Sequence, residues 1–242
     1  MKANSGNEGS AAKNGKLPNA QLRRGRTDGV TVLYITRHAV TAPNQEDLVQ
    51  GRRYDSEISD AGKLQSEELA VELLRHKIDV AYCSSMRRCR QSIMPYKNSA
   101  GIKVNYVKDL EERDYGVFDG RPGSEYREWI RRNGFEGNYS FRPPGGETFQ
   151  DLRARARAVM REILARHGGE AILIMAHCAT GVAIMLNLFN EREEGNYVKY
   201  MLKNCALSVV EIRYGRPHLE LLNSTAHLKN TESTGKARSP TP

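Results

Sequence analysis

The chain has 242 residues, with 37 lysines and arginines against 29 aspartates and glutamates, so its formal charge is +8. Hydrophobic residues make up 39% of it and aromatic residues 7%, a composition that excludes disordered, collagen-like and disulfide-scaffold proteins. Its longest apolar runs, such as Ala171–Ala176, are far shorter than the ~20 residues that a membrane span needs. A substantial core is possible, because a chain of this size buries ~70% of its unfolded surface.

The positive charge lies mainly at the two ends of the chain. Residues 1–28 carry six basic and two acidic groups, and residues 229–242 carry three basic and one acidic. These ends contribute +4 and +2, which leaves only +2 for residues 29–228. We therefore predict one folded domain over 29–228, between a disordered basic tail at 1–28 and a disordered C-terminal tail at 229–242.

Short apolar or β-branched runs alternate with longer amphipathic runs in the central part. In chain order we predict a strand Val30–Thr36, a helix Asp60–Lys77, strands Asp79–Ser84 and Lys103–Val107, a helix Phe149–His167, a strand Ala171–Ala176, a helix after His177 through Leu188, and strands Ser208–Tyr214 and His218–Asn223. This alternation favours an α/β fold, a three-layer α/β/α sandwich with a mostly parallel central sheet.

Two local details accompany these elements. Ser59 is the expected N-cap of the first helix, whose apolar face is predicted to carry Leu64, Ala70, Leu73 and Leu74. The segment 119–147, rich in glycine, proline and arginine, indicates a long excursion from the sheet, where substrate loops are commonly placed.

Histidine and arginine side chains are expected at the ends of three of these strands. Arg37 and His38 end the first strand, Arg88 follows the second, and His177 stands between the fourth strand and a helix. Ligands of open α/β sheets bind beyond the carboxyl ends of the strands, and a helix N-terminus beside His177 favours phosphate. Together these residues predict a small-anion site, although each one singly has a structural alternative.

Metal and thiol chemistry are not expected. The remaining histidines have no metal-ligand spacing and the chain has no C-x-x-C, so we predict neither a metal site nor a cofactor. Four cysteines at irregular spacings indicate reduced thiols, typical of a cytoplasmic protein. Organelle targeting by the basic N-terminal tail stays open.

Seven segments, in order along residues 30–228, resemble the histidine phosphatase superfamily, which has the phosphoglycerate mutase-like fold. They are Arg37-His38-Ala39 with Asn44 beyond it, QGRRYDSEISDAG, CSSMRRCRQS, LEERDYGVFDG, PPGGET, AHCATG and LLNSTAHL. Only 26 residues separate Gly116 from Pro143, where family mutases carry a long insertion. The resemblance is therefore to the phosphatase branch.

The resemblance implies a metal-independent phosphomonoester hydrolase, which acts on a small phosphorylated metabolite. His38 would attack phosphorus to form a phosphohistidine, and Glu112 would protonate the leaving group. The phosphate oxygens would be held by Arg37, Arg88, His177 and Asn44.

Three further residues are assigned to substrate or phosphate binding. Thr41 closely follows the nucleophile, and Arg113 follows the proton donor, where it would grip a second anionic group. Cys178 replaces a family glycine and would offer its backbone N–H to the phosphate. Ala39 replaces another family glycine and adds only one methyl group.

Two alternative functions stay open. The segment Glu112–Gly116 resembles the mutase form of the acid-bearing segment, so a phosphoglycerate mutase-type phosphotransferase is one alternative. The other is a phospholigand-binding or interaction protein recruited by its basic tails. We expect no specific nucleic-acid partner, and the oligomeric state is open, with a homodimer as one option.

Overall fold

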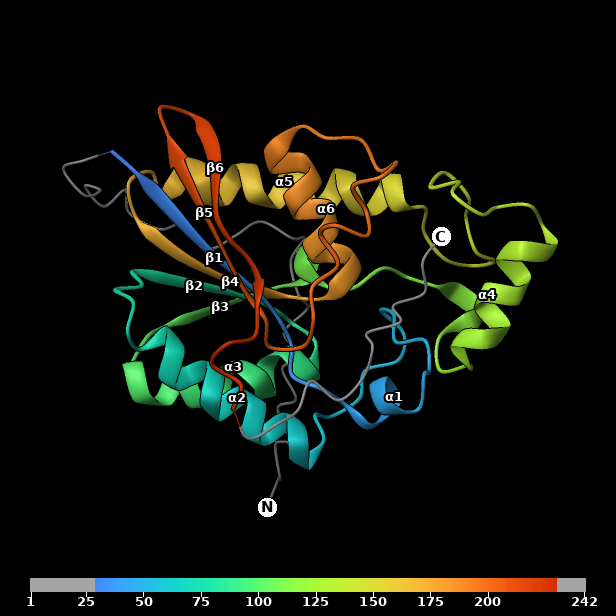
Figure 1. The fold of residues 1–242 in the computed structure, drawn as a ribbon, viewed down its shortest axis with the longest axis horizontal. Helices are drawn as coiled ribbons and strands as arrows, with labels where there is room; N and C mark the ends of the chain where they lie inside the picture. The colour runs from blue at the N-terminus through green and yellow to red at the C-terminus, as the bar shows by residue number, and fades with distance from the viewer. Residues whose placement is uncertain (1–28, 230–242) are drawn as a thin grey trace, which may run out of the picture.

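One six-stranded sheet organises the fold (Figure 1). The computed structural model describes residues 29–229, so the predictions about residues 1–28 and 230–242 lie outside the described residues. The strands are β1 (Thr31–Arg37), β2 (Val80–Ser84), β3 (Val104–Val107), β4 (Ala171–Ala176), β5 (Leu207–Arg213) and β6 (Arg216–Ser224). Their order is β3-β2-β4-β1-β5-β6, and among these six β5 runs in the opposite direction to the other five, so its pairings with β1 and β6 are antiparallel. The predicted mostly parallel sheet is confirmed.

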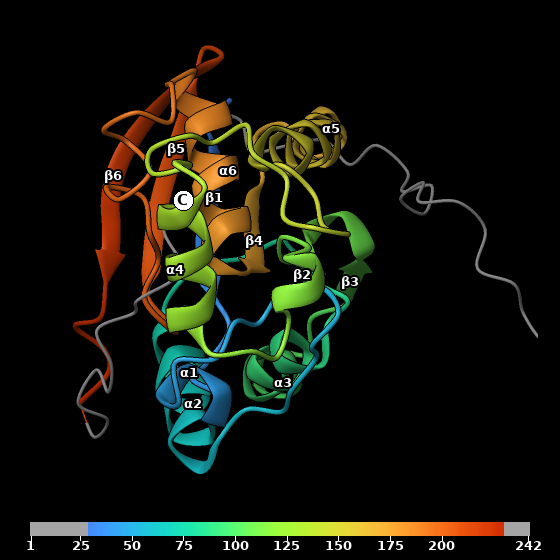
Figure 2. The same cartoon turned by 90° about the vertical axis from the view of Figure 1, so that its right-hand side faces the viewer.

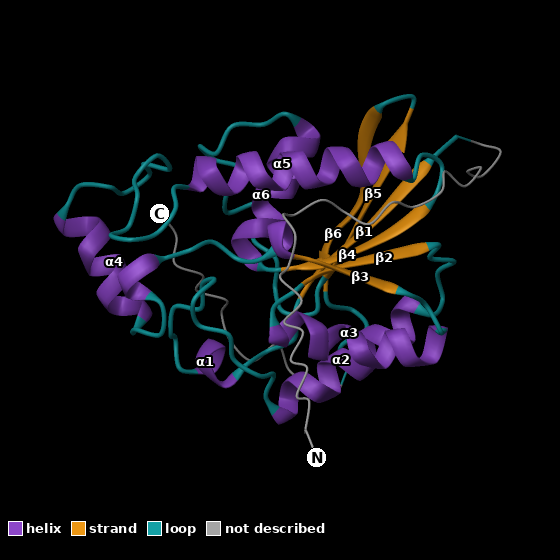
Figure 3. Cartoon of the chain, turned by 180° about the vertical axis from the view of Figure 1, so that it is seen from behind, coloured by secondary structure: helices purple, strands orange, loops and turns teal. Residues whose placement is uncertain are grey.

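Helices cover both faces of this sheet (Figure 3). The α-helices are α1 (Ala42–Gln45), α2 (Asp60–Leu73), α3 (Arg87–Ala100), α4 (Gly123–Arg132), α5 (Phe149–Arg166) and α6 (Cys178–Phe189), and the 3-10 turns are η1 (Lys108–Leu110) and η2 (Gly116–Phe118). Helices α2 and α3 lie on one face, and α5 and α6 lie on the other. The predicted three-layer sandwich is therefore confirmed. Within residues 29–229, no helix has the length and apolar character needed to cross a bilayer.

The core has two halves, one on each face of the sheet. Leu33 and Ile35 of β1 pack with the apolar faces of α5 and α6, whereas Ala81 and Cys83 of β2 pack with α2 and α3. Every residue of β4 is buried, because helices cover this central strand from both sides. The catalytic candidates at the strand ends are thus attached to the buried centre of the sheet.

Helix α2 buries only part of its predicted apolar face: Ala70 and Leu73 are buried, but Leu64 and Leu74 are not. The Ser59 side chain accepts from Gly62 N, which confirms the N-cap. Leu64 and Leu74, however, are 49% and 47% exposed, while Leu69 and Leu73 are at most 1% exposed. The stripe of buried residues with i, i+3, i+4, i+7 spacing starts at Gly62, and Leu64 and Leu74 lie outside it.

Helix α3 was not expected as a helix. Its first turn carries three arginines, so its composition indicated a solvated face, but Cys89, Ile93 and Tyr96 form a fully buried stripe against the sheet. The helix also contains Pro95. The arginines and the proline hide the helical spacing of the apolar residues in the sequence, but the packing of those residues stabilises the helix.

The excursion at residues 119–147 carries α4 and stands beyond the carboxyl ends of the strands (Figures 1 and 2). Its aromatic side chains build a third, small core in which Tyr126 packs on Phe118 and Phe141. The two ends of the excursion are joined, because Val117 N donates to Pro144 O over 3.0 Å. The excursion therefore has a small core, which Val49, Tyr115 and Phe118 complete from outside it.

Candidate active site

The predicted strand-end residues meet at one place. Arg37 and His38 leave β1, Arg88 lies in the first turn of α3 behind β2, and His177 is the N-cap of α6 behind β4. His38 N donates to Ala176 O over 3.1 Å, which ties the end of β1 to the end of β4. The ring centroids of the two histidines are 5.2 Å apart.

His38 is arranged as a neutral nucleophile. Its Nδ1 lies 2.8 Å from Ala39 O, and because a carbonyl oxygen only accepts, we assign the proton to Nδ1. Nε2 therefore keeps a free lone pair. Burial, followed by the positive charges of Arg88 and Arg37, holds the pKa of His38 well below its usual value.

His177 has the opposite tautomer. Arg88 Nε donates to its Nδ1 over 3.2 Å, and Nε2 lies 2.8 Å from Ser84 Oγ, so we assign the proton to Nε2. Burial and then the charge of Arg88 lower the pKa of His177 well below its usual value. Ser84, at the end of β2, was not singled out from the sequence.

The two arginines carry the positive charge of the site. Arg88 is fully buried and donates to the carbonyl oxygens of Tyr54 and Gln50; burial lowers its pKa. Arg37 Nη1 donates to Leu202 O over 3.0 Å. The Nε of Arg37 is buried and has no hydrogen-bond partner within residues 29–229, so this donor remains for an anion.

Thr41 and Asn44 shape the loop after the nucleophile. Thr41 is the N-cap of α1, and the two residues form a reciprocal capping box. Asn204, which the sequence did not reveal, donates from Nδ2 to His38 O over 3.0 Å and to Asn44 Oδ1 over 3.3 Å. It joins the nucleophile to this loop.

The last residues that the structure describes support the segment that carries Asn204. Asn223 donates to Met201 O and accepts from Lys203 N, and His227 Nε2 lies 3.0 Å from Cys205 O. Asn223 and His227 therefore hold residues 201–205 in place, and Asn204 of this segment in turn contacts His38 and Asn44.

The side chain of Glu112 lies at the N-terminus of α6, the helix that begins directly after His177. Its carboxylate accepts from the backbone N–H groups of Ala179 and Thr180, each over 3.1 Å, and from Arg113 N over 2.9 Å. The first turn of α6 was expected to bind phosphate with free N–H groups, but this carboxylate takes two of them. Helix and carboxylate stabilise each other because the helix dipole favours a negative group here.

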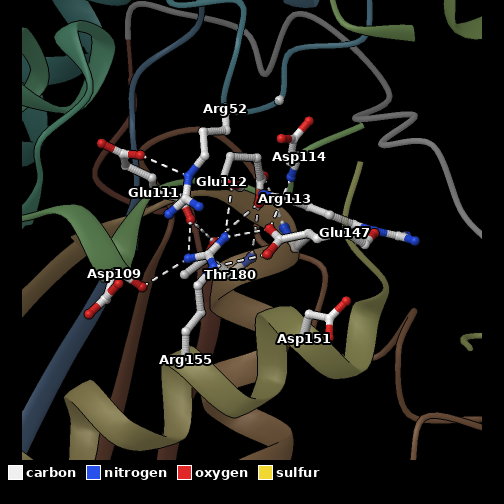
Figure 4. Close-up of polar contacts among 12 residues, drawn as sticks. Arg52, Asp109, Glu111, Glu112, Arg113, Asp114, Glu147, Asp151, Arg155 and Thr180 are labelled. Carbon is white, nitrogen blue, oxygen red and sulfur yellow. Dashed lines mark hydrogen bonds and ion pairs between the residues drawn. The ribbon is translucent and has the colours of Figure 1, made fainter. Parts of the chain in front are cut away.

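Arg155 of α5 fixes the segment that bears Glu112 (Figure 4). Its guanidinium donates to the carbonyl oxygens of Asp109, Glu111 and Glu112, over 2.7–2.9 Å, and pairs with the Glu147 carboxylate at 2.7 Å. Both side chains of the pair are 13% exposed. All five N–H groups of the guanidinium are used.

The other two predicted binding residues, Arg113 and Cys178, are both buried. The guanidinium of Arg113 donates to Glu147 O and Phe141 O. Cys178 begins α6 and is 2% exposed. Within the described part of the chain, no group of three histidine, cysteine or acidic side chains is placed to hold a metal ion.

Comparison with known proteins agrees with this fold. Residues 33–225 match the model of the histidine phosphatase superfamily (branch 1). The chain therefore belongs to this superfamily, and it is a phosphatase of the phosphoric monoester hydrolase type.

Individual relatives show how far the similarity extends. A probable phosphatase of Schizosaccharomyces pombe is 28% identical over 84% of this chain and 98% of its own length. The fructose-2,6-bisphosphatase TIGAR of Xenopus tropicalis is 35% identical over 52% of this chain and 46% of the length of TIGAR. The structure of a phosphoserine phosphatase of Entamoeba histolytica with 3-phosphoglyceric acid superposes with a TM-score of 0.74, at 22% identity, over 82% of this chain and all of its own.

Proposed function

We propose that the protein hydrolyses a small phosphorylated metabolite without a metal ion, through a phosphohistidine on His38. The neutral His38 with its free Nε2 is the observation that carries the proposal. Attack by Nε2 on phosphorus breaks the bond to the leaving oxygen, while Arg37, Arg88 and His177 stabilise the charge of the transferring phosphoryl group. The names of the relatives support a small phosphorylated substrate.

Glu112 is the proposed acid and base of this reaction. Its Oε2 accepts a single backbone hydrogen bond, from Ala179 N, whereas Oε1 accepts two. Oε2 is therefore the oxygen with room for a proton. It delivers that proton to the leaving alkoxide, and the resulting carboxylate then takes a proton from the water that hydrolyses the phosphohistidine.

Rapid quenching of the enzyme with ³²P-labelled substrate in the presence of EDTA tests this mechanism. We expect an acid-labile phosphoenzyme, which His38→Ala abolishes together with turnover. His218→Ala, a change at an exposed histidine of β6, is the matched control and should keep both. Full activity of His38→Ala would contradict the proposal, and transfer of the label to added phosphoglycerate instead of water would favour the mutase alternative.

A further inference from the structure

Two side chains from neighbouring helices hold the residue that follows the nucleophile. Ala39 N donates to Oγ of Ser92, on α3, over 2.8 Å. The next backbone N–H, that of Val40, donates to Oε1 of Gln65, on α2, over 3.0 Å. Ser92 is 1% exposed and Gln65 is 2% exposed. The reaction proposed at His38 uses neither side chain directly, so their role lies in what they hold.

Gln65 sets the direction of the carbonyl group that faces the nucleophile. The peptide group between Ala39 and Val40 is trans, so its C=O and N–H point in opposite directions in one plane. Its N–H points at Gln65 Oε1, and its C=O points at the His38 ring, whose Nδ1 lies 2.8 Å from Ala39 O. Because this carbonyl oxygen only accepts, it keeps the ring proton on Nδ1 and leaves Nε2 free to attack.

Ser92 holds the other peptide group of Ala39. Its hydroxyl donates to Arg88 O over 2.6 Å, and since a hydroxyl has a single hydrogen, a lone pair of Oγ accepts from Ala39 N. The two hydrogen bonds run in series from Ala39 N–H through the hydroxyl to Arg88 O, an arrangement in which each bond strengthens the other. Ser92 therefore joins the residue after the nucleophile to the turn of α3 that carries Arg88, whose guanidinium contacts His177.

A rotated Ala39 carbonyl group would release the ring of the nucleophile. The imidazole can then turn about its side-chain bonds or carry its proton on Nε2, and either change removes the lone pair from the line of attack. Building on the proposed attack by His38, we propose that Ser92 and Gln65 are positioning residues, which hold the two peptide groups of Ala39 and so keep His38 protonated on Nδ1 and aimed at phosphorus. Since a displacement of about 1 Å can cost about 100-fold in rate, their effect falls on formation of the phosphohistidine.

The kcat/KM for p-nitrophenyl phosphate measures this effect, because it reports on the steps up to release of p-nitrophenol. Ser92→Ala and Gln65→Met each remove one acceptor and leave the volume nearly unchanged. We expect each variant to lower kcat/KM about 10- to 100-fold, with the Ki of inorganic phosphate within about 2-fold of wild type. Ser92→Thr and Gln65→Glu, which keep an acceptor, should recover part of the rate.

Ser66→Ala is the matched control for these variants. Ser66 is 2% exposed on α2, and its hydroxyl donates to Lys63 O of the same helix over 2.7 Å. Its loss therefore removes a buried serine hydroxyl from a helix without touching residues 38–40, and kcat/KM should stay within about 2-fold of wild type.

NMR of the enzyme labelled with ¹⁵N-histidine provides a readout that general destabilisation does not change. Wild type and Ser66→Ala should show the His38 ring with its proton on Nδ1, and this signal is assigned by its absence from the spectrum of His38→Gln. Ser92→Ala and Gln65→Met should show a mixture of the two tautomers of His38. A slow variant with the wild-type tautomer, or a kcat/KM within about 2-fold of that of Ser66→Ala, would overturn the proposal.

The two measurements separate this proposal from the proposed function. The NMR spectrum needs no turnover, so a tautomer change in the variants, together with absence of a phosphoenzyme in wild type, would refute the phosphohistidine mechanism alone. A phosphoenzyme in wild type, with rate and tautomer unchanged in both variants, would refute the positioning alone. If circular dichroism shows that one variant does not fold, the other decides, because the proposal requires the effect from each.

Discussion

Replacement of Arg155 by methionine should destabilise the protein strongly. The change leaves the Glu147 carboxylate, 13% exposed, without its cationic partner, and leaves three carbonyl oxygens without a donor. Breaking a buried pair in this way costs about 3–5 kcal/mol, a large share of the 5–15 kcal/mol typical of a whole domain. With an m-value of about 2–3 kcal/mol/M in urea, the unfolding midpoint should fall by about 1–2.5 M.

Urea unfolding followed by circular dichroism measures this effect, with Arg157→Met as the matched control. Arg157 lies on the same helix, and its hydrogen bond to Asn187 is exposed, so we expect a loss of at most about 0.5 kcal/mol. Lysine in place of Arg155 should recover only part of the stability, because an ammonium cannot match five N–H groups in one plane. A midpoint shift below about 0.3 M for Arg155→Met would show that the network contributes little, which would refute the assigned role of this arginine.

Three further predictions concern titration and backbone conformation. Burial lowers the pKa of His38 and of His177, so at low pH the unfolded chain binds protons that the folded chain does not. The free energy of unfolding should therefore fall as the pH drops below about 6.5. If the variant with both residues changed to glutamine showed the same dependence of unfolding free energy on pH as wild type, the prediction would be wrong. Burial raises the pKa of Asp119 to about 6, so between about pH 4 and 6 the folded chain holds a proton that the unfolded chain has lost. The free energy of unfolding should therefore fall as the pH rises through this range. Urea titrations of Asp119→Asn should not show this fall. Gly116 has φ +60°, and a Cβ added there would lie 2.0 Å from a backbone oxygen. Gly215 also has a positive φ, +75°, but a Cβ added there would have nothing within 4 Å. Gly116→Ala should therefore lower the Tm much more than Gly215→Ala does.

The sheet and the central site residues were predictable because they have local signatures. β-branched runs bounded by turns located all six strands, and β4 was placed at its observed bounds. Arg37, His38 and His177 follow directly from those strands, since parallel strands end on one edge. A pattern of period two or 3.6 contains this information without knowledge of any distant contact.

The supporting residues were not predictable, because their partners lie far away along the chain. Arg155 binds carbonyl oxygens more than 40 residues before it, and a carbonyl oxygen gives no signal in a sequence. Asn204 reaches His38 across 166 positions. The orientation of Arg113 likewise depends on which carbonyl oxygens the folded excursion presents, which only tertiary structure decides.

The joined ends of the excursion at residues 119–147 affect where the chain can change in length. Val117 N and Pro144 O hold its two ends together, and its first residues bond to residues 47–53, as Arg121 O does to Val49 N. Residues 131–138 are mostly exposed, so this stretch can accept insertions while those contacts are kept. Insertions of this kind are cheap in loop-closure entropy. The length of this exposed stretch can therefore vary while the ends of the excursion stay joined.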